Sequence, residues 1–127
     1  MSADGQGSFT GYLRFDGYVG VCNHVLVISI IGLVNRVAER IAQSVAVTIH
    51  VTRPYGRGQY SVDKLSHRAQ LAGRFRNPNL AGVLVVGADR IAIDESVKAA
   101  ETSGKPVSVA ALYDTHENAL EACARGI

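Results

Sequence analysis

The chain is poor in aromatic and charged residues and has no tryptophan. Aromatic residues make up 6% and charged residues 19% of its 127 residues, whereas apolar residues reach 47%. This balance excludes an intrinsically disordered chain and suits one globular domain. The net charge is only +2, which gives no reason to expect nucleic acid or a membrane as a partner.

Cysteine is also scarce, and targeting segments are not evident. Cys22 and Cys123 lie far apart and form no metal-binding motif, and the four histidines show no HxxH or HExxH spacing. A reduced, cytoplasmic protein is therefore expected, with no metal or other cofactor held by this chain alone. Residues 1–8 lack the basic start and apolar core of a signal peptide and are predicted to be a flexible tail. No apolar run reaches transmembrane length.

The clearest structural pattern lies between residues 23 and 51. The run from Val25 to Ile31 is apolar and rich in β-branched residues, which is typical of a strand buried on both faces. From Leu33 onward, apolar residues recur every four positions, which predicts an amphipathic helix. A second apolar run, residues 45–51, predicts the next strand. The segment therefore predicts a βαβ unit with parallel strands.

The rest of the chain continues this alternation of strands and helices. Residues 9–23 suit a hairpin or an extended arm. The other expected elements are a helix over 61–76 buried through Val62, Leu65, Ala69, Ala72 and Phe75, a strand over 81–86, a helix over 94–102, a strand over 107–112, and a last helix that starts near Asp114 and buries Leu120, Cys123 and Ala124. Residues 9–127 are thus predicted to form one α/β domain, a three-layer Rossmann-like sandwich. Its four-stranded, mainly parallel sheet has the order 2-1-3-4 and carries helices on both faces.

A binding site is expected beyond the carboxyl ends of the strands, where ligands bind in open parallel sheets. The loop after the second strand carries the strongest signal. Arg53 and Arg57 offer forked cationic donors for a carboxylate or phosphate, Gly56 and Gly58 let the backbone approach a ligand, and Gln59 adds a neutral donor and acceptor. Two interpretations stay open: an anion-binding site, or a surface loop whose arginines are solvated.

Other candidate residues give weaker signals. His50 ends the second strand and is the one weak candidate for a catalytic base, with a non-catalytic rim histidine as the alternative. Asp89 is included in the predicted anion site because its carboxylate is a candidate partner of Arg57. Asp89 and Arg90 together are better explained as a surface ion pair or a turn than as an acid–base pair. The basic residues of the helix over 61–76 fit its solvated face, with an interface as the alternative: Arg68, Arg74 and Arg76.

Several segments, in one order, resemble the altronate/galactarate dehydratase family. Residues 11–23 (GYLRFDGYVGVCN) resemble its opening pattern, GY-hydrophobic-R-x-DGR-x-G-x-RN, and residues 77–87 (NPNLAGVLVVG) match best. Residues 35–42, 104–107 and 124–127 agree as well. The resemblance covers the chain from about residue 9 and corresponds to the first α/β domain of the family's large catalytic region. It extends to the large subunit of sulfolactate sulfo-lyase.

The resemblance implies a lyase that uses iron or another divalent metal to remove water from sugar acids, or in a related branch sulfite from sulfolactate. It implies a domain or subunit that is not active alone and that works as a homo-oligomer or with a partner subunit supplying the missing domains. Arg53, Arg57 and Gln59 would bind the carboxylate of a sugar acid or another small anion, and Asn35 and Asn23 would order the neighbouring turns.

This sequence also departs from the family pattern. Arg57 stands where the family usually has cysteine, Tyr18 and Cys22 stand where it has arginines, and residues 88–90 replace a turn that often carries another cysteine. Arginine is neither a metal ligand nor a nucleophile. The alternative hypothesis is therefore a diverged, non-catalytic module of the same fold that binds anions or serves assembly.

Overall fold

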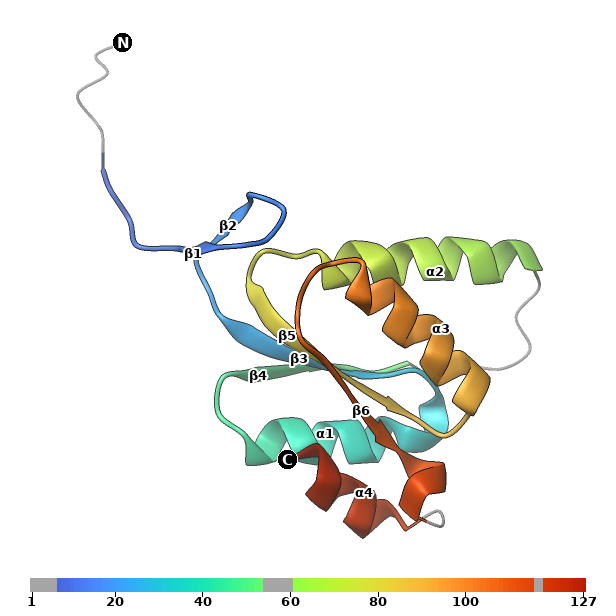
Figure 1. Ribbon diagram of the computed structural model, residues 1–127. Coiled ribbons are helices and arrows are strands. Elements are labelled where there is room, and N and C mark those ends of the chain that lie inside the picture. The colour runs from blue at the N-terminus through green and yellow to red at the C-terminus, as the bar shows by residue number, and fades with distance from the viewer. Residues whose placement is uncertain (1–6, 54–60, 116–117) are drawn as a thin grey trace.

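The computed structural model describes residues 7–53, 61–115 and 118–127. Its centre is a parallel sheet of four strands in the order β4-β3-β5-β6 (Figure 1). The strands are β3 (His24–Ser29), β4 (Thr48–Val51), β5 (Leu80–Gly87) and β6 (Val107–Ala111). All three pairs of neighbouring strands run parallel. The predicted α/β class, the parallel sheet and the strand order are therefore confirmed.

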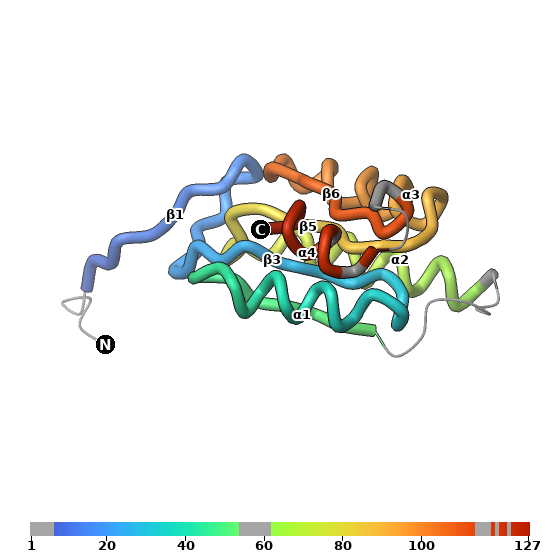
Figure 2. Tube along the Cα trace, turned by 90° about the horizontal axis from the view of Figure 1, so that it is seen from below, coloured from blue at the N-terminus to red at the C-terminus, as the bar shows by residue number. Residues whose placement is uncertain are grey.

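Two helices cover each face of this sheet. Helices α2 (Ser61–Phe75) and α3 (Arg90–Glu101) pack on one face, and α1 (Asn35–Ser44) and α4 (Ala119–Gly126) pack on the other (Figures 1 and 2). Two 3-10 helices, η1 (Gly32–Val34) and η2 (Leu112–Thr115), follow the ends of β3 and β6. The three layers predicted from the alternating pattern are therefore present.

The sheet separates two hydrophobic clusters because successive strand residues point to opposite faces. Leu26, Ile28, Val83 and Val85 lie on the side of α2 and α3. On the other side, Val27, Leu84 and Val86 pack with α1 and α4. Both faces of β3 and β5 are buried, which explains their continuous apolar sequences.

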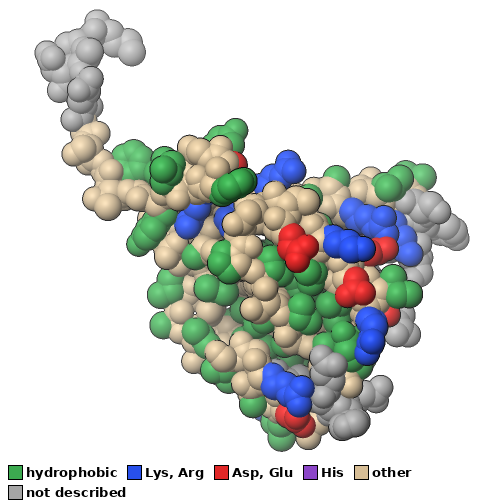
Figure 3. Space-filling model, in the orientation of Figure 1, with side chains coloured by type: hydrophobic (Ala, Val, Ile, Leu, Met, Phe, Trp, Pro, Cys, Tyr) green, Lys and Arg blue, Asp and Glu red, His purple; other side chains and the backbone are tan. Residues whose placement is uncertain are grey.

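A small hairpin precedes the sheet, as expected for residues 9–23. Strands β1 (Tyr12–Leu13) and β2 (Val19–Gly20) pair antiparallel. Gly20 packs so closely against the turn after α2 that a Cβ added there would lie 2.0 Å from the Pro78 carbonyl oxygen. Apolar side chains of the hairpin remain open to solvent at the upper left of Figure 3, and Phe15 is 90% exposed.

Arg14 fastens this hairpin to the amino end of the sheet. Its Nε donates to the Pro78 carbonyl oxygen at 2.6 Å, and its Nη2 donates to the Cys22 carbonyl and to Asn23 Oδ1 at 3.1 and 3.0 Å. Asn79 Oδ1 accepts hydrogen bonds from the backbone N–H groups that follow β2. Asn23 thus orders a turn at the edge opposite the predicted site.

The burial predicted for α2 is wrong as far as Ala69. Val62 and Leu65 are 73% and 65% exposed and Ala69 is exposed as well, whereas Leu71 and Phe75 are buried. The 15 residues of α2 extend about 22 Å, and both buried side chains lie in the second half of the helix. The helix therefore extends past the sheet, as Figure 1 shows.

Two helix starts also differ from the prediction. Helix α3 begins four residues earlier than expected, at Arg90, because the Asp89 side chain caps it by accepting from Ile91 N. Helix α4 begins after Asn118, whose Oδ1 accepts from the N–H groups of the next turn, while Asp114 lies in η2. Two residues of this helix that were expected to be buried are exposed: Leu120, by 67%, and Ala124.

Candidate functional site

The carboxyl ends of β3 and β4 are joined by one polar network. The buried Ser29 hydroxyl donates to Asn35 Oδ1, and Asn35 Nδ2 donates to the Arg53 carbonyl oxygen at 2.7 Å. In return, Arg53 N donates to Ser29 Oγ and Asn35 Oδ1, both at 3.3 Å. Asn35, the first residue of α1, thus fixes the backbone position from which the Arg53 side chain starts.

The Arg53 guanidinium turns back over the end of β3. Its Nη1 donates to the Ile30 carbonyl oxygen at 3.0 Å. Its Nη2 is buried and has no hydrogen-bond partner within the described residues. Burial lowers the pKa of Arg53, and the positive charge of Arg74 lowers it further. A buried cationic donor without a partner is costly, which makes this atom a candidate ligand-binding group.

His67, on α2, is a half-buried side chain with a second buried nitrogen that lacks a partner. Its Nε2 has no hydrogen-bond partner in the described part of the chain. Burial lowers the pKa of His67, and the charges of Arg53 and Arg74 add to that effect. The three side chains therefore lie within one electrostatic environment. Sequence reasoning did not select His67, and it assigned Arg74 to the solvated face of the helix.

Two other predicted site residues, His50 and Asp89, are not joined to this network. His50 lies exposed on the edge strand β4, opposite Val27, and its side chain makes no hydrogen bond or ion pair with any described residue. Asp89 caps α3, and the Arg90 guanidinium stacks over the Tyr113 ring at 4.8 Å, so these two neighbours do not form an ion pair. The predicted anion-binding residues Gly56, Arg57, Gly58 and Gln59 lie outside the described residues.

The chemistry of this edge does not fit a divalent metal. Within residues 7–53, 61–115 and 118–127, no three His, Cys, Asp or Glu side chains lie close enough to hold one. The groups around Arg53 are an amide, a hydroxyl, the His67 imidazole and the second guanidinium of Arg74, and none of them is negatively charged. Divalent metals prefer carboxylate, thiolate and neutral imidazole ligands. This set of groups suits an anion.

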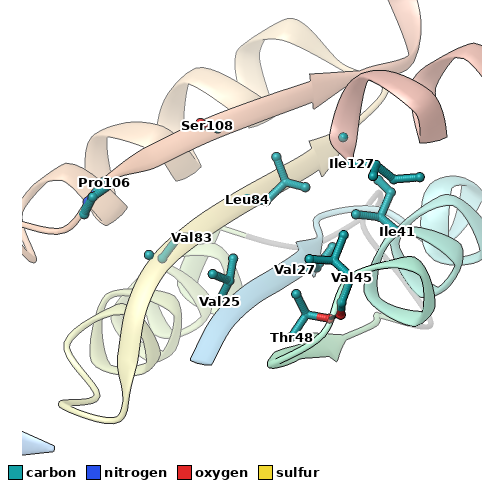
Figure 4. A pocket seen from close by; sticks show the side chains of 12 residues that line it. Val25, Val27, Ile41, Val45, Thr48, Val83, Leu84, Pro106, Ser108 and Ile127 are labelled. Atoms are coloured by element: carbon teal, nitrogen blue, oxygen red, sulfur yellow. Dashed lines mark hydrogen bonds between the residues drawn. The ribbon is translucent and has the colours of Figure 1, made fainter. Parts of the chain in front are cut away.

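A separate apolar cavity lies on the α1/α4 face, toward the amino ends of the strands. It has a volume of about 290 Å³. In Figure 4, Val25 and Val27 of β3 and Leu84 of β5 lie on its sheet side, and Ile41 and Val45 face them from the α1 side. Of the predicted site residues that the structure describes, none lines it, and its polar side chains, Thr48 and Ser108, carry no charge. The cavity and the candidate anion site are therefore different places.

Comparison with known proteins places the chain in a family. Residues 11–127 match the family described as D-galactarate dehydratase/Altronate hydrolase, second domain. The chain belongs to this family. The resemblance found in the sequence motifs is thereby confirmed at the level of the family, while the placement as first α/β domain of a large catalytic region stays a prediction.

One curated relative is the (2R)-sulfolactate sulfo-lyase subunit beta of Chromohalobacter salexigens. It is 37% identical over 100 residues, which cover 79% of this chain and 26% of the relative. The chain thus spans about a quarter of that protein's length. No solved structure matches the present chain. None of the helices among the described residues is long and apolar enough to cross a bilayer.

Proposed function

We propose that this member of the dehydratase family is a domain or subunit of a carbon–oxygen lyase of the altronate/galactarate type, and that it binds the carboxylate of a sugar acid without completing the reaction alone. The observation that carries the proposal is the position of the Arg53 guanidinium and the missing partner of one of its nitrogens. The guanidinium is held at the carboxyl edge of the sheet by one nitrogen, while the other is buried and lacks a partner. A carboxylate oxygen is the acceptor that this geometry favours.

The role of Arg53 in dehydration follows from the charge that develops. A base removes the proton on the carbon next to the carboxylate, the electron pair of that C–H bond moves toward the carboxylate, and the hydroxyl on the neighbouring carbon leaves with a proton as water. Negative charge therefore accumulates on the carboxylate oxygens before the C–O bond breaks. A fixed guanidinium stabilises that charge without having to reorganise. Arg57 and Gln59 are proposed to contact the same substrate.

The base and the metal are proposed to come from elsewhere in the enzyme. His50, the one candidate base, is exposed and is not part of the Arg53 network. The donors around Arg53 do not suit a divalent metal. The curated relative is named as one subunit of its enzyme and is about four times longer than the matched segment. A partner subunit, or the further domains of a longer protein in which this is the first α/β domain of the catalytic region, would supply both groups.

Titration calorimetry with galactarate tests the proposal. Wild type should bind it, and Arg53→Gln should weaken the binding about 10- to 100-fold, because a charge-assisted hydrogen bond contributes about 1.5–3 kcal/mol. Arg36→Gln is the matched control, because the Arg36 side chain is 92% exposed on the outer side of α1. Equal affinity of the Arg53→Gln and Arg36→Gln variants would refute the proposed carboxylate site.

Activity assays on the isolated chain test the second half of the proposal. We expect no turnover of altronate, galactarate or sulfolactate, with or without iron(II). Turnover by the isolated chain would show that it holds a complete active site. Purification from its native source distinguishes an enzyme subunit from a non-catalytic module, because a subunit should co-purify with the chain that supplies the missing domains.

A further inference from the structure

The segment of residues 9–21, here called the arm, contains the β1–β2 hairpin and exposes several large apolar side chains. Phe9, Phe15 and Tyr18 are 70%, 90% and 67% exposed, and Leu13 is 76% exposed. Soluble monomers rarely expose contiguous apolar patches of more than a few hundred Å², and larger patches mark sites of interaction. The arm therefore has the composition of a contact surface.

The arm is held in place where it joins the sheet, so its rings do not fold back over the core. Arg14 Nε donates to the Pro78 carbonyl oxygen at 2.6 Å, and Gly20 packs against the same carbonyl with no room for a Cβ. The Phe15 ring lies against Gly104 and still stays exposed to solvent. A surface that covers these rings has to come from outside the residues that the structure describes.

The apolar cavity on the α1/α4 face offers a matching surface at the same end of the molecule. Val25 and Thr48, at the amino ends of β3 and β4, line it together with Pro106, which precedes β6 (Figure 4). Val25 and Pro106 are exposed, so the cavity is open to solvent on this side. Gly104, against which the Phe15 ring lies, is two residues before Pro106. The arm and the cavity are therefore neighbours at the amino edge of the sheet.

The size and polarity of the cavity suit aromatic side chains. Its volume is about 290 Å³, and the side chains that line it carry no charge. A cavity of about 150 Å³ with aliphatic walls is large enough to bind benzene. The present cavity therefore has room for one or two rings of the size of Phe15, and the other apolar side chains of the arm would lie against its rim.

Two reciprocal contacts between arm and cavity bury as much surface as a stable interface needs. An aromatic side chain buries about 150–250 Å², so the three exposed rings of one arm cover about 400 Å². A copy that gives its arm and also receives one buries about 800 Å², which is the area per partner in a standard interface. A one-way contact buries about 800 Å² in total, which is the upper limit of crystal-packing contacts.

We propose that the arm of one copy inserts its aromatic side chains into the apolar cavity of a second copy, which does the same in return, so that two chains form a symmetric dimer. Such an interface is isologous and closes after two copies. The charges of the arm agree with this partner. Arg14 is engaged with backbone carbonyls, and Asp16 is the other charged residue of the arm, whereas a surface for anionic lipid would carry free basic side chains.

Sedimentation equilibrium of the full 127-residue chain tests the dimer. Wild type should sediment with twice its monomer mass of 13.5 kDa. Phe15→Ser should raise the dimer Kd about 100-fold, because the contact occurs twice and each anchoring ring contributes about tenfold. Leu65→Ser is the matched control, because Leu65 is a comparably exposed apolar side chain on α2, which covers the other face of the sheet. It should change the Kd less than about twofold.

A second pair of variants tests the cavity side of the contact. Ser108→Asp places a carboxylate at the cavity, where it meets apolar rings and the Asp16 carboxylate of the arm, and it should also raise the Kd about 100-fold. Ser66→Asp, on the exposed surface of α2, adds the same charge elsewhere and should have little effect. Because Phe15, Ser66 and Ser108 are exposed, the variants should keep the circular dichroism spectrum and the melting temperature of wild type.

Mixing the two weakened variants distinguishes an exchange of arms from any other dimer. In a mixed pair, the intact arm of the Ser108→Asp chain meets the intact cavity of the Phe15→Ser chain, so one of the two contacts is restored. The mixture should therefore associate about tenfold more tightly than either variant alone. A mixture that associates no better than its components would overturn the exchange of arms. A wild type that stays at 13.5 kDa up to about 1 mM would overturn the dimer itself.

Discussion

Asn35 provides the sharpest test of how the candidate site is held in place. Replacing it with alanine leaves the Ser29 hydroxyl, which is fully buried, without its acceptor and the Arg53 carbonyl without its donor. Each unsatisfied group costs about 1–3 kcal/mol. Because Asn35 is only half-buried and water can reach part of the gap, we expect a loss of about 2–4 kcal/mol in unfolding free energy. That is a large share of the roughly 5–15 kcal/mol typical of a domain.

Urea denaturation followed by circular dichroism measures this loss. Gln43→Ala is the matched control, because it removes a similar amide from the exposed face of the same helix and should change stability by less than about 0.5 kcal/mol. A double-mutant cycle with Ser29→Ala should give a coupling energy of about 1–2 kcal/mol. If Asn35→Ala costs no more than Gln43→Ala, the network does not hold the strand ends and our account of the Arg53 position is wrong.

Three further predictions concern a turn, the hairpin and pH. Val47 has a φ of 61°, which β-branched residues rarely adopt, so Val47→Asn should raise the unfolding free energy by about 1 kcal/mol in urea titrations; an unchanged midpoint would mean that the turn is not strained. Gly20→Ala should lower the unfolding free energy by about 1–3 kcal/mol, because the new Cβ would clash with the Pro78 carbonyl oxygen. An unchanged unfolding free energy would show that the hairpin does not dock as described. The folded state keeps His67 neutral at a pH where the unfolded chain binds a proton, because its folded pKa is lowered. Stability should therefore fall as the pH drops below about 6.5, and melts between pH 5 and 8 should lose part of this slope in His67→Gln.

The topology of the sheet was predictable because it depends on patterns that the sequence displays directly. Strands β3 and β5 are buried on both faces, so their apolar runs are uninterrupted. The edge strand β4 is different, since it starts only at Thr48 although the apolar run begins at Val45. Its backbone must first leave α1 through the unusual conformation at Val47, which hydrophobicity alone does not indicate.

The candidate site was predictable only on its strand side. Arg53 follows a predicted strand, and the rule that ligands bind at carboxyl ends selects it. His67 and Arg74 lie on a helix, and their importance depends on which face of α2 meets the sheet. The apolar periodicity selected Val62 and Leu65 for that face, but these side chains are exposed because the first half of α2 extends past the sheet. The position of the helix, which is a tertiary property, decides this part of the site.

The overhang of α2 has a consequence for local motion. The exposed first half of the helix depends on its own hydrogen bonds and on an exposed ion pair between Arg68 and Glu95, whereas the second half is fixed by Leu71 and Phe75 in the core. Isolated helical turns are marginal in water, so the amide protons near Val62 and Leu65 should exchange with solvent much faster than those near Phe75. His67 lies at the boundary between these two parts. A carboxylate bound at Arg53, whose charge lowers the pKa of His67, would change the charge next to this boundary, so that occupancy of the site could be followed from amide exchange in the helix.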